Sequence, residues 1–360
     1  MDDILKKSTE LNRDPVLVLK GGKLCYLNNA ARSLFPAAEL GKSVSDLIPE
    51  EILSTPSESF CASVTVKREA YSFSALRSGD ELLLSLAPIE PSPEVRGCLS
   101  DSLMNGMLSS LFNIGLSMER IHSSIDTSDP AVQEYLAILN HNYYALNRKL
   151  ANLLYFCASS DSSVLIVRRN TDLSKLCADI TDAVNAVTCP DRARVEYTCA
   201  ANSVAASVDA VKIERLILNL LANSLLHTPA DGRVRLRLSS TGSSAVISVD
   251  DNGCGIPLEK LNNIFCSYKN RLDERSLAAP SNGGLGLGIC RSIAEKHGGT
   301  LILESRVGEG TSVRVTLPLA ADGEVFRSER SEYECGGMSA ILTELSDVLD
   351  TSAYDSKYSD

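Results

Sequence analysis

The stretch DAVKIERLILNLLANSLLHTP, residues 209–229, decides the fold of the C-terminal half of the chain. Its apolar residues recur with the period of a helix, so Asn219 and Asn223, four residues apart, lie on one face. A carboxamide oxygen is a hard, neutral ligand that suits Mg²⁺ bound to nucleotide phosphates. By itself the pair also fits a purely structural role, because buried carboxamides need hydrogen-bond partners.

A predicted strand that ends in an acidic glycine turn follows, with the sequence VISVDDNGCGIP at residues 246–257. Gly253 and Gly255 permit positive φ angles and a close approach of the backbone to a ligand. The carboxylate of Asp251 can accept a hydrogen bond from the exocyclic amine of adenine, where guanine has a carbonyl oxygen. The turn therefore predicts a site that prefers adenine.

A glycine-rich segment, NGGLGLGI at residues 282–289, leads into a predicted helix that ends at His297. Glycine-rich backbone before a helix start presents N–H groups to phosphate oxygens. The segment lacks the G-K-[ST] ending of a Walker loop, and it does not follow a strand in a compact βαβ unit. Both of those nucleotide-binding classes are therefore disfavoured. Residues 300–318 then predict two strands around a turn.

Taken in order, these segments resemble the histidine-kinase branch of the GHKL ATPases over residues 164–318. An aromatic box between them matches only in part, at Ile264, Phe265 and Tyr268. Cys266 and Ser267 stand where the family usually has Glu and Pro. The resemblance implies an α/β sandwich, with helices on one face of a mixed sheet, that holds Mg·ATP under a flexible lid at residues 269–282.

The resemblance also implies roles for single residues. Asn223 would be the Mg²⁺ ligand, Asn219 would be a second catalytic residue near the phosphates and metal, and Asp251 would anchor adenine. The other cofactor-binding residues would be Gly253, Gly255, Gly284, Leu285, Gly286, Leu287, Gly288 and Thr311. Leu226 stands where the family often has Lys or Arg, and the loss of that phosphate contact would weaken ATP binding.

Strands are predicted upstream, over residues 14–88. Apolar runs at residues 15–19 and 24–27 flank the Gly21-Gly22 turn, which is typical of a hairpin. A helix is predicted to open at residues 28–31, and further strands at residues 60–66, 70–76 and 81–86. The strand order, together with Asn29, Ala30 and Ala31, resembles a PAS sensor fold.

Helical heptads occupy residues 95–157. Apolar residues recur at spacings of 3 and 4 from Met104 to Ile121 and again from Val132 to Cys157. Sustained heptads make a seam that another helix must cover, so the pattern predicts an antiparallel hairpin within a homodimeric four-helix bundle. A hairpin packed on its own chain is the alternative. The hairpin resembles the family's dimerisation and phosphoacceptor module.

The hairpin departs from that family at the acceptor site. The family has a histidine, then an acidic residue, and a proline five positions after the histidine. Here Ser102, Leu103 and Met107 align with them, and no histidine precedes His122. A serine hydroxyl needs a base, and Leu103 supplies none. His122 and His141 are interpreted as ordinary surface residues.

Composition sets limits on the partners and the compartment. A net charge of −11 over 360 residues disfavours nucleic acid and anionic membranes. Eleven cysteines scattered singly predict neither a disulfide framework nor a zinc site. No apolar run approaches the ~20 residues of a membrane helix, and the acidic start lacks the features of a signal peptide. We therefore expect a cytoplasmic protein.

The predicted fold class is α+β and multidomain. We expect a PAS-like α/β sensor at residues 1–91, the hairpin at 92–160, the ATP-binding domain at 161–320 and an acidic tail at 321–360. The tail is expected to be flexible or loosely docked, with one short amphipathic helix.

Two functions fit these expectations. One is a histidine-kinase-type enzyme of a two-component-type pathway that transfers or hydrolyses the γ-phosphate of Mg·ATP, with a response regulator or other signalling protein as its partner. The other is a pseudokinase in which ATP occupancy and dimer conformation regulate a partner without autophosphorylation. A serine kinase of the anti-sigma type is disfavoured by the bundle and the PAS-like segment.

Overall fold

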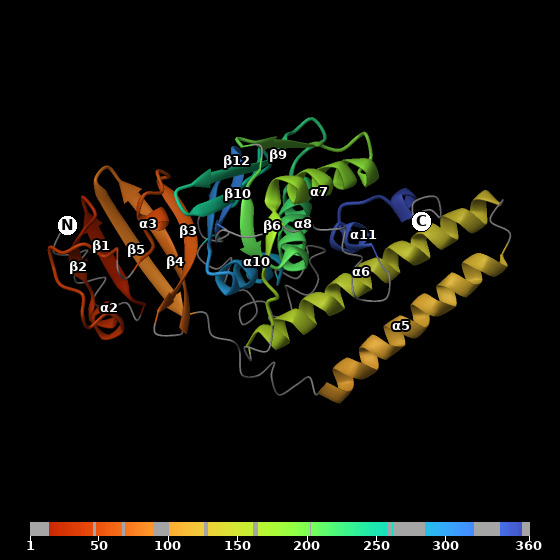
Figure 1. Ribbon diagram of the computed structural model, residues 1–360, viewed down its shortest axis with the longest axis horizontal. Helices are drawn as coiled ribbons and strands as arrows, with labels where there is room; N and C mark the ends of the chain where they lie inside the picture. Colours follow the sequence, from red (N-terminus) through yellow and green to blue (C-terminus); the bar gives the residue numbers. More distant parts are fainter. Residues whose placement is uncertain are drawn as a thin grey trace.

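The computed structural model describes residues 14–45, 48–66, 69–88, 101–125, 129–160, 165–201, 203–257, 261, 285–319 and 339–354. Figure 1 shows an N-terminal sheet, a long helical hairpin, an α/β region and a C-terminal segment that returns to the hairpin. The predicted lid, the aromatic box and Gly284 lie outside the described residues. No helix in the described part of the chain combines the length and apolarity needed to cross a membrane.

The N-terminal sheet has five antiparallel strands in the order β2-β1-β5-β4-β3. They are β1 (Val16–Lys20), β2 (Lys23–Leu27), β3 (Ser59–Val66), β4 (Glu69–Ser78) and β5 (Glu81–Pro88), with helices α2 (Asn29–Leu34) and α3 (Glu50–Leu53). Buried Asn28 fixes the first hairpin to α2, because its Oδ1 accepts hydrogen bonds from Val16 N (3.0 Å) and Ala31 N (2.9 Å). Each strand predicted from the sequence is present.

This sheet is continuous with the sheet of the α/β region. Strand β3 pairs antiparallel with β11 (Thr300–Arg306), with Ala62 opposite Ile302 and Cys61 opposite Leu303. Ile302 packs into the N-terminal core, and Cys61 packs into the core of the α/β region. One ten-stranded sheet therefore spans both regions (Figure 1), although the sequence predicted a separate sensor domain.

The hairpin consists of α5 (Asp101–Ser124) and α6 (Pro130–Ser160). Asp129 caps α6, because its Oδ1 accepts a hydrogen bond from Ala131 N (2.9 Å). Four positions of the predicted seam are buried within the chain: Leu111, Met118, Leu136 and Leu150. Five other positions are exposed to solvent: Met107, Ile114, Ile121, Leu139 and Leu146. The hairpin thus covers only part of its apolar stripe.

The α/β region contains a mixed sheet in the order β7-β9-β10-β12-β11, in which only β7 and β9 are parallel. Helices α7, α8 and α10 contact this sheet and meet each other through α8. The elements are β6 (Arg169–Asp172), α7 (Leu173–Val187), β7 (Val195–Cys199), β8 (Ala205–Val208), α8 (Ala210–His227), β9 (Val234–Thr241), β10 (Ser244–Asp251), α10 (Leu285–Lys296) and β12 (Gly310–Pro318). Strands β6 and β8 form a separate antiparallel pair. Each of them directly precedes a helix, β6 before α7 and β8 before α8.

The C-terminal segment, defined here as residues 339–354, is docked against α6 and α8. It contains helix α11 (Ala340–Glu344) and the 3-10 helix η1 (Thr351–Tyr354). Its buried apolar side chains belong to the core of the α/β region: Leu342, Leu345, Val348, Leu349 and Tyr354. The expectation of a loosely docked tail is therefore wrong for these residues, because their apolar face is covered by two helices.

His297 is a buried residue that ties α10 to the start of α8. Its Nδ1 donates to the carbonyl of Ile293 (2.7 Å), and its Nε2 accepts from Asp209 N (3.0 Å). Only the neutral imidazole can donate from one nitrogen and accept at the other. Burial lowers the pKa of His297 below its ordinary value of 6.5.

We expect this histidine to make folding stability depend on pH. Because the pKa of His297 is lower in the folded state, the unfolded chain binds more protons below about pH 6.5, so stability is lost as pH falls through that value. The contribution is at most about 1.4 kcal/mol per pH unit. Urea unfolding between about pH 7.5 and 5.5 should show a shallower loss in His297→Gln than in the wild type.

A matched control is His227→Gln, since His227 is exposed at the end of α8. That variant should retain the pH dependence of the wild type. Equal slopes for His297→Gln and the wild type would show that the buried imidazole is not the titrating group.

Candidate functional site

Asp251, the predicted adenine anchor, lies where β10 ends beside α8. Asp251 is the last residue of β10, and its Oδ1 accepts hydrogen bonds from Gly253 N (3.0 Å) and Thr311 N (3.1 Å). Its Oδ2 accepts a hydrogen bond from Ser224 Oγ (2.9 Å) on α8. Burial raises the pKa of Asp251 above its ordinary value, although these hydrogen bonds act in the opposite direction. The carboxylate is thus fixed in orientation and partly desolvated.

Glycines allow the chain to close tightly around Asp251. A Cβ on Gly253 would lie 2.4 Å from the carbonyl oxygen of His227, and one on Gly310 would lie 2.0 Å from the carbonyl oxygen of Asp251. Gly255 has φ +68°, and a Cβ there would lie 1.9 Å from the carbonyl oxygen of Arg306. The turn after β10 therefore fits between the end of α8 and the β11–β12 turn only because Gly253 and Gly255 have no side chains.

The two asparagines of α8 lie beside the first turn of α10. Asn219 is fully buried, and its Nδ2 donates to Arg215 O (3.0 Å) and Glu344 Oε2 (2.9 Å). Among the described residues, Asn219 Oδ1 has no hydrogen-bond partner. A Cβ on Gly286 would lie 3.0 Å from that oxygen and 3.9 Å from Asn223 Nδ2. Both carboxamides therefore face the point where α10 begins.

Helix α10 begins at Leu285, so Gly286, Leu287 and Gly288 lie in its first turn. The side chains of Leu285 and Leu287 are partly buried against the core, so we expect the backbone of these residues to face a ligand. At Gly288 a Cβ would meet nothing within 4 Å among the described atoms. No atom of the described residues therefore covers the helix start on the side of Gly288.

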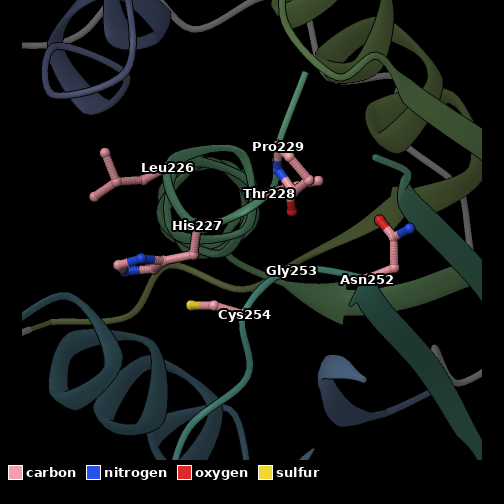
Figure 2. A pocket seen from close by; sticks show the side chains of 7 residues that line it. All are labelled: Leu226, His227, Thr228, Pro229, Asn252, Gly253 and Cys254. Carbon is pink, nitrogen blue, oxygen red and sulfur yellow. The ribbon is translucent and has the colours of Figure 1, made fainter. Parts of the chain in front are cut away.

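An open pocket lies next to this arrangement, at the C-terminal end of α8 (Figure 2). Figure 2 shows the side chains of His227 and Cys254 on one side of Gly253, and Asn252 on the other. Its lining residues are Leu226, His227, Thr228, Pro229, Asn252, Gly253 and Cys254. Leu226 thus lines a pocket close to the predicted site. A Lys or Arg at this position would attract an anionic ligand, and Leu226 does not.

The donor set suits a divalent cation that is shared with phosphates. Mg²⁺ keeps several waters and takes only one or two protein oxygens, so it needs no cluster of acidic ligands. The described residues contain no group of three His, Cys, Asp or Glu side chains placed to hold a metal. The oxygen of Asn219, buried and without a partner among those residues, together with the nearby carboxamide of Asn223, fits this mode of binding.

The structure brings Asn219, Asn223 and Gly286 together, and Ser224 links the same helix to Asp251. Sequence reasoning missed Ser224 and Glu344. Serine beside Asn223 carries no pattern of its own, and Glu344 lies far along the chain in a segment that reads as polar.

Comparisons with known proteins identify a family match and several relatives. Residues 208–321 match the family described as histidine kinase-, DNA gyrase B-, and HSP90-like ATPase. The adaptive-response sensory kinase SasA of Synechocystis sp. is 25% identical over 259 residues, which cover 69% of this chain and 67% of that protein. The sensor histidine kinase TmoS of Ectopseudomonas mendocina is 31% identical over 185 residues, which cover 51% of this chain and 19% of that protein.

A solved structure of full-length ShkA in complex with AMPPNP has a similar fold. Its TM-score is 0.52 at 17% sequence identity, and the match covers 64% of this chain and 47% of that one. The chain also spans about half the length of the sensor protein CutS of Streptomyces coelicolor, at 29% identity.

Proposed function

Because this chain belongs to the sensor histidine kinases, with an ATPase domain at residues 208–321, we propose that it binds Mg·ATP between α8, β10 and α10. The binding serves a signal transducer of the two-component type. The observation that supports this most is that two carboxamides of α8 face the start of α10, while Ser224 of the same helix holds the oriented carboxylate of Asp251.

Each group has a distinct task in this proposal. Asp251 accepts the hydrogen bond of the adenine amine, while Ser224 and Thr311 hold its carboxylate in place. Asn223 ligates Mg²⁺, and Asn219 presents its oxygen to the same region. The backbone of Gly286 and Gly288 lies against the phosphates, where N–H groups at a helix start favour anions. When bound, Mg²⁺ neutralises charge on the phosphates.

A second candidate function, the pseudokinase, is favoured by the position of His141. Its Nε2 lies 2.9 Å from the carbonyl oxygen of Ser346, and its ring packs on Tyr354 with centroids 5.2 Å apart. Nε2 must carry its proton to donate to that carbonyl, so this nitrogen has no lone pair with which to attack a phosphate. The interpretation of His141 as an ordinary surface residue needs correction, because the ring packs on the C-terminal segment. Ser102 lies in α5 at the aligned acceptor position.

We propose that the output is passed to a signalling protein such as a response regulator. Incubation of the purified chain with γ-labelled ATP and Mg²⁺ tests which function applies. We expect nucleotide binding without acid-labile label on this chain. Label on His122 or His141 would contradict that expectation, while label lost in Ser102→Ala would identify a serine acceptor. Label that appears only on an added partner would favour the kinase.

The proposed transducer is a homodimer in the cytoplasm, with the N-terminal sheet as a PAS-like sensor. The exposed residues of the hairpin seam support the dimer, since an apolar stripe of this kind is stable in water when a second hairpin covers it. The strand order β2-β1-β5-β4-β3 supports the sensor.

Charges placed in the exposed seam should therefore separate the protomers. We expect the double variant Ile114→Asp, Leu139→Asp to behave as a monomer in light scattering at concentrations where the wild type is a dimer, because aspartates in that seam would be buried without partners. Leu165→Asp is the control, since Leu165 is exposed outside the hairpin. A dimer that survives the double variant would place the interface elsewhere.

A further inference from the structure

A buried polar cluster joins the C-terminal segment to α6 and α8. Glu344 is fully buried, and its Oε1 accepts a hydrogen bond from Arg215 Nε (3.0 Å) on α8. Its Oε2 accepts from Arg148 Nε (3.2 Å) on α6 and from Asn219 Nδ2 (2.9 Å) on α8. One carboxylate thus receives donors from two helices that are separated in sequence by the whole of α7.

This contact decides how the carboxamide of Asn219 is turned. A carboxylate only accepts hydrogen bonds, so it faces the Nδ2 group and not the oxygen. The carbonyl oxygen of Arg215 selects the same orientation from within α8. With Nδ2 held by two acceptors, Oδ1 faces the start of α10 at Gly286. Rotation of this amide would place two donors in the region proposed for Mg²⁺ and phosphate.

The cluster also connects this orientation to the hairpin. Arg215 donates through Nη2 to Asn152 Oδ1 (2.8 Å) on α6, and its guanidinium lies 5.1 Å from the ring centroid of Tyr155. Arg148 forms a second ion pair with Asp347, which is partly exposed. The position of α6 is therefore linked to Asn219 through Glu344 and Arg215.

We propose that Glu344 is a positioning residue of the nucleotide site, through which the C-terminal segment orients Asn219 toward the phosphate and metal end of Mg·ATP. This rests on the proposed function. The segment then completes the site, and nucleotide binding and docking of the segment favour each other, because coupling between two sites is reciprocal. Arg148 of α6 belongs to the same cluster. A change in the position of α6 should therefore alter both the docking of the segment and nucleotide affinity.

The test compares Glu344→Gln with Asp347→Asn in the full chain. Both remove one negative charge near Arg148, but only Glu344 contacts Asn219. We expect Glu344→Gln to bind Mg·ATP about tenfold more weakly, within the range of ordinary coupling between sites. Its affinity for ADP in the presence of a chelator should change less than about twofold, because the adenine contact at Asp251 is untouched. Asp347→Asn should match the wild type for both ligands.

An equal loss for both ligands in Glu344→Gln would mean a purely structural role and would overturn the proposal. In an Asn219→Ala background, Glu344→Gln should cause no further loss of Mg·ATP affinity, since the two residues act as one unit. A wild-type chain that binds neither ligand would instead refute the proposed function.

A second measurement uses the unmodified chain, in case Glu344→Gln does not fold. Amide hydrogen exchange of residues 339–354 should be slower with Mg·ATP than with ADP and chelator. Equal exchange rates with the two ligands would overturn the proposal.

Discussion

Replacing Asp251 with asparagine should weaken Mg·ATP binding by roughly a hundredfold, or about 3 kcal/mol. The Oδ1 position can still accept from Gly253 and Thr311, but Oδ2 becomes an NH₂ group that faces the adenine amine donor to donor. The charged hydrogen bond is lost, and the adenine amine meets a donor in place of its acceptor. Calorimetric titration of the variant with Mg·ATP measures the loss directly.

The neighbouring substitution Asp250→Asn provides the control. Asp250 turns away from Asp251, accepting a hydrogen bond from Ser312 Oγ (2.6 Å) and pairing with Arg237 (2.7 Å). We expect the Mg·ATP affinity of Asp250→Asn to stay within about twofold of the wild type. Equal affinities for the two variants would remove Asp251 from the nucleotide site.

Alanine at Gly255 should cost about 4 kcal/mol of folding stability, the upper range for single substitutions. The positive φ of +68° strains any residue with a side chain, and the new Cβ would lie 1.9 Å from the carbonyl oxygen of Arg306. That oxygen belongs to β11, which is paired on both sides, so the turn must move instead. Urea unfolding measures the effect.

Gly308 is the matched position, because its φ is +80° but a Cβ there meets nothing within 4 Å. Gly308→Ala should therefore cost only the backbone strain, about 1–2 kcal/mol. If Gly255→Ala and Gly308→Ala destabilise the fold equally, the contact with Arg306 is not what requires glycine.

Much of the local structure was readable from the sequence. The Gly21-Gly22 turn, the alternating strands and the helical heptads each produced the predicted element, because local periodicity determines them. The hydrogen bond between Asp251 and Gly253 is also local, because Asp251 ends β10 and Gly253 belongs to the turn that follows. These features depend on neighbours close in the chain.

Two arrangements depend on distant contacts and had no local signal. The pairing of β3 with β11 uses main-chain groups, and its interlocking side chains, Cys61 and Ile302, read as ordinary core residues. Glu344 read as one of many acids in a polar tail, and its meaning appears only when Arg148 and Arg215 meet around it. An ion pair between residues far apart in the chain, such as Glu344 with Arg215, cannot be predicted from the sequence around either residue alone.

The most direct test is a crystal structure of the full chain with Mg²⁺ and a non-hydrolysable ATP analogue. We predict the adenine amine within about 3 Å of Asp251 Oδ2 and the metal about 2.1 Å from the Asn223 oxygen, with the phosphates at the start of α10. A nucleotide bound elsewhere, or one with its base away from Asp251, would contradict the account.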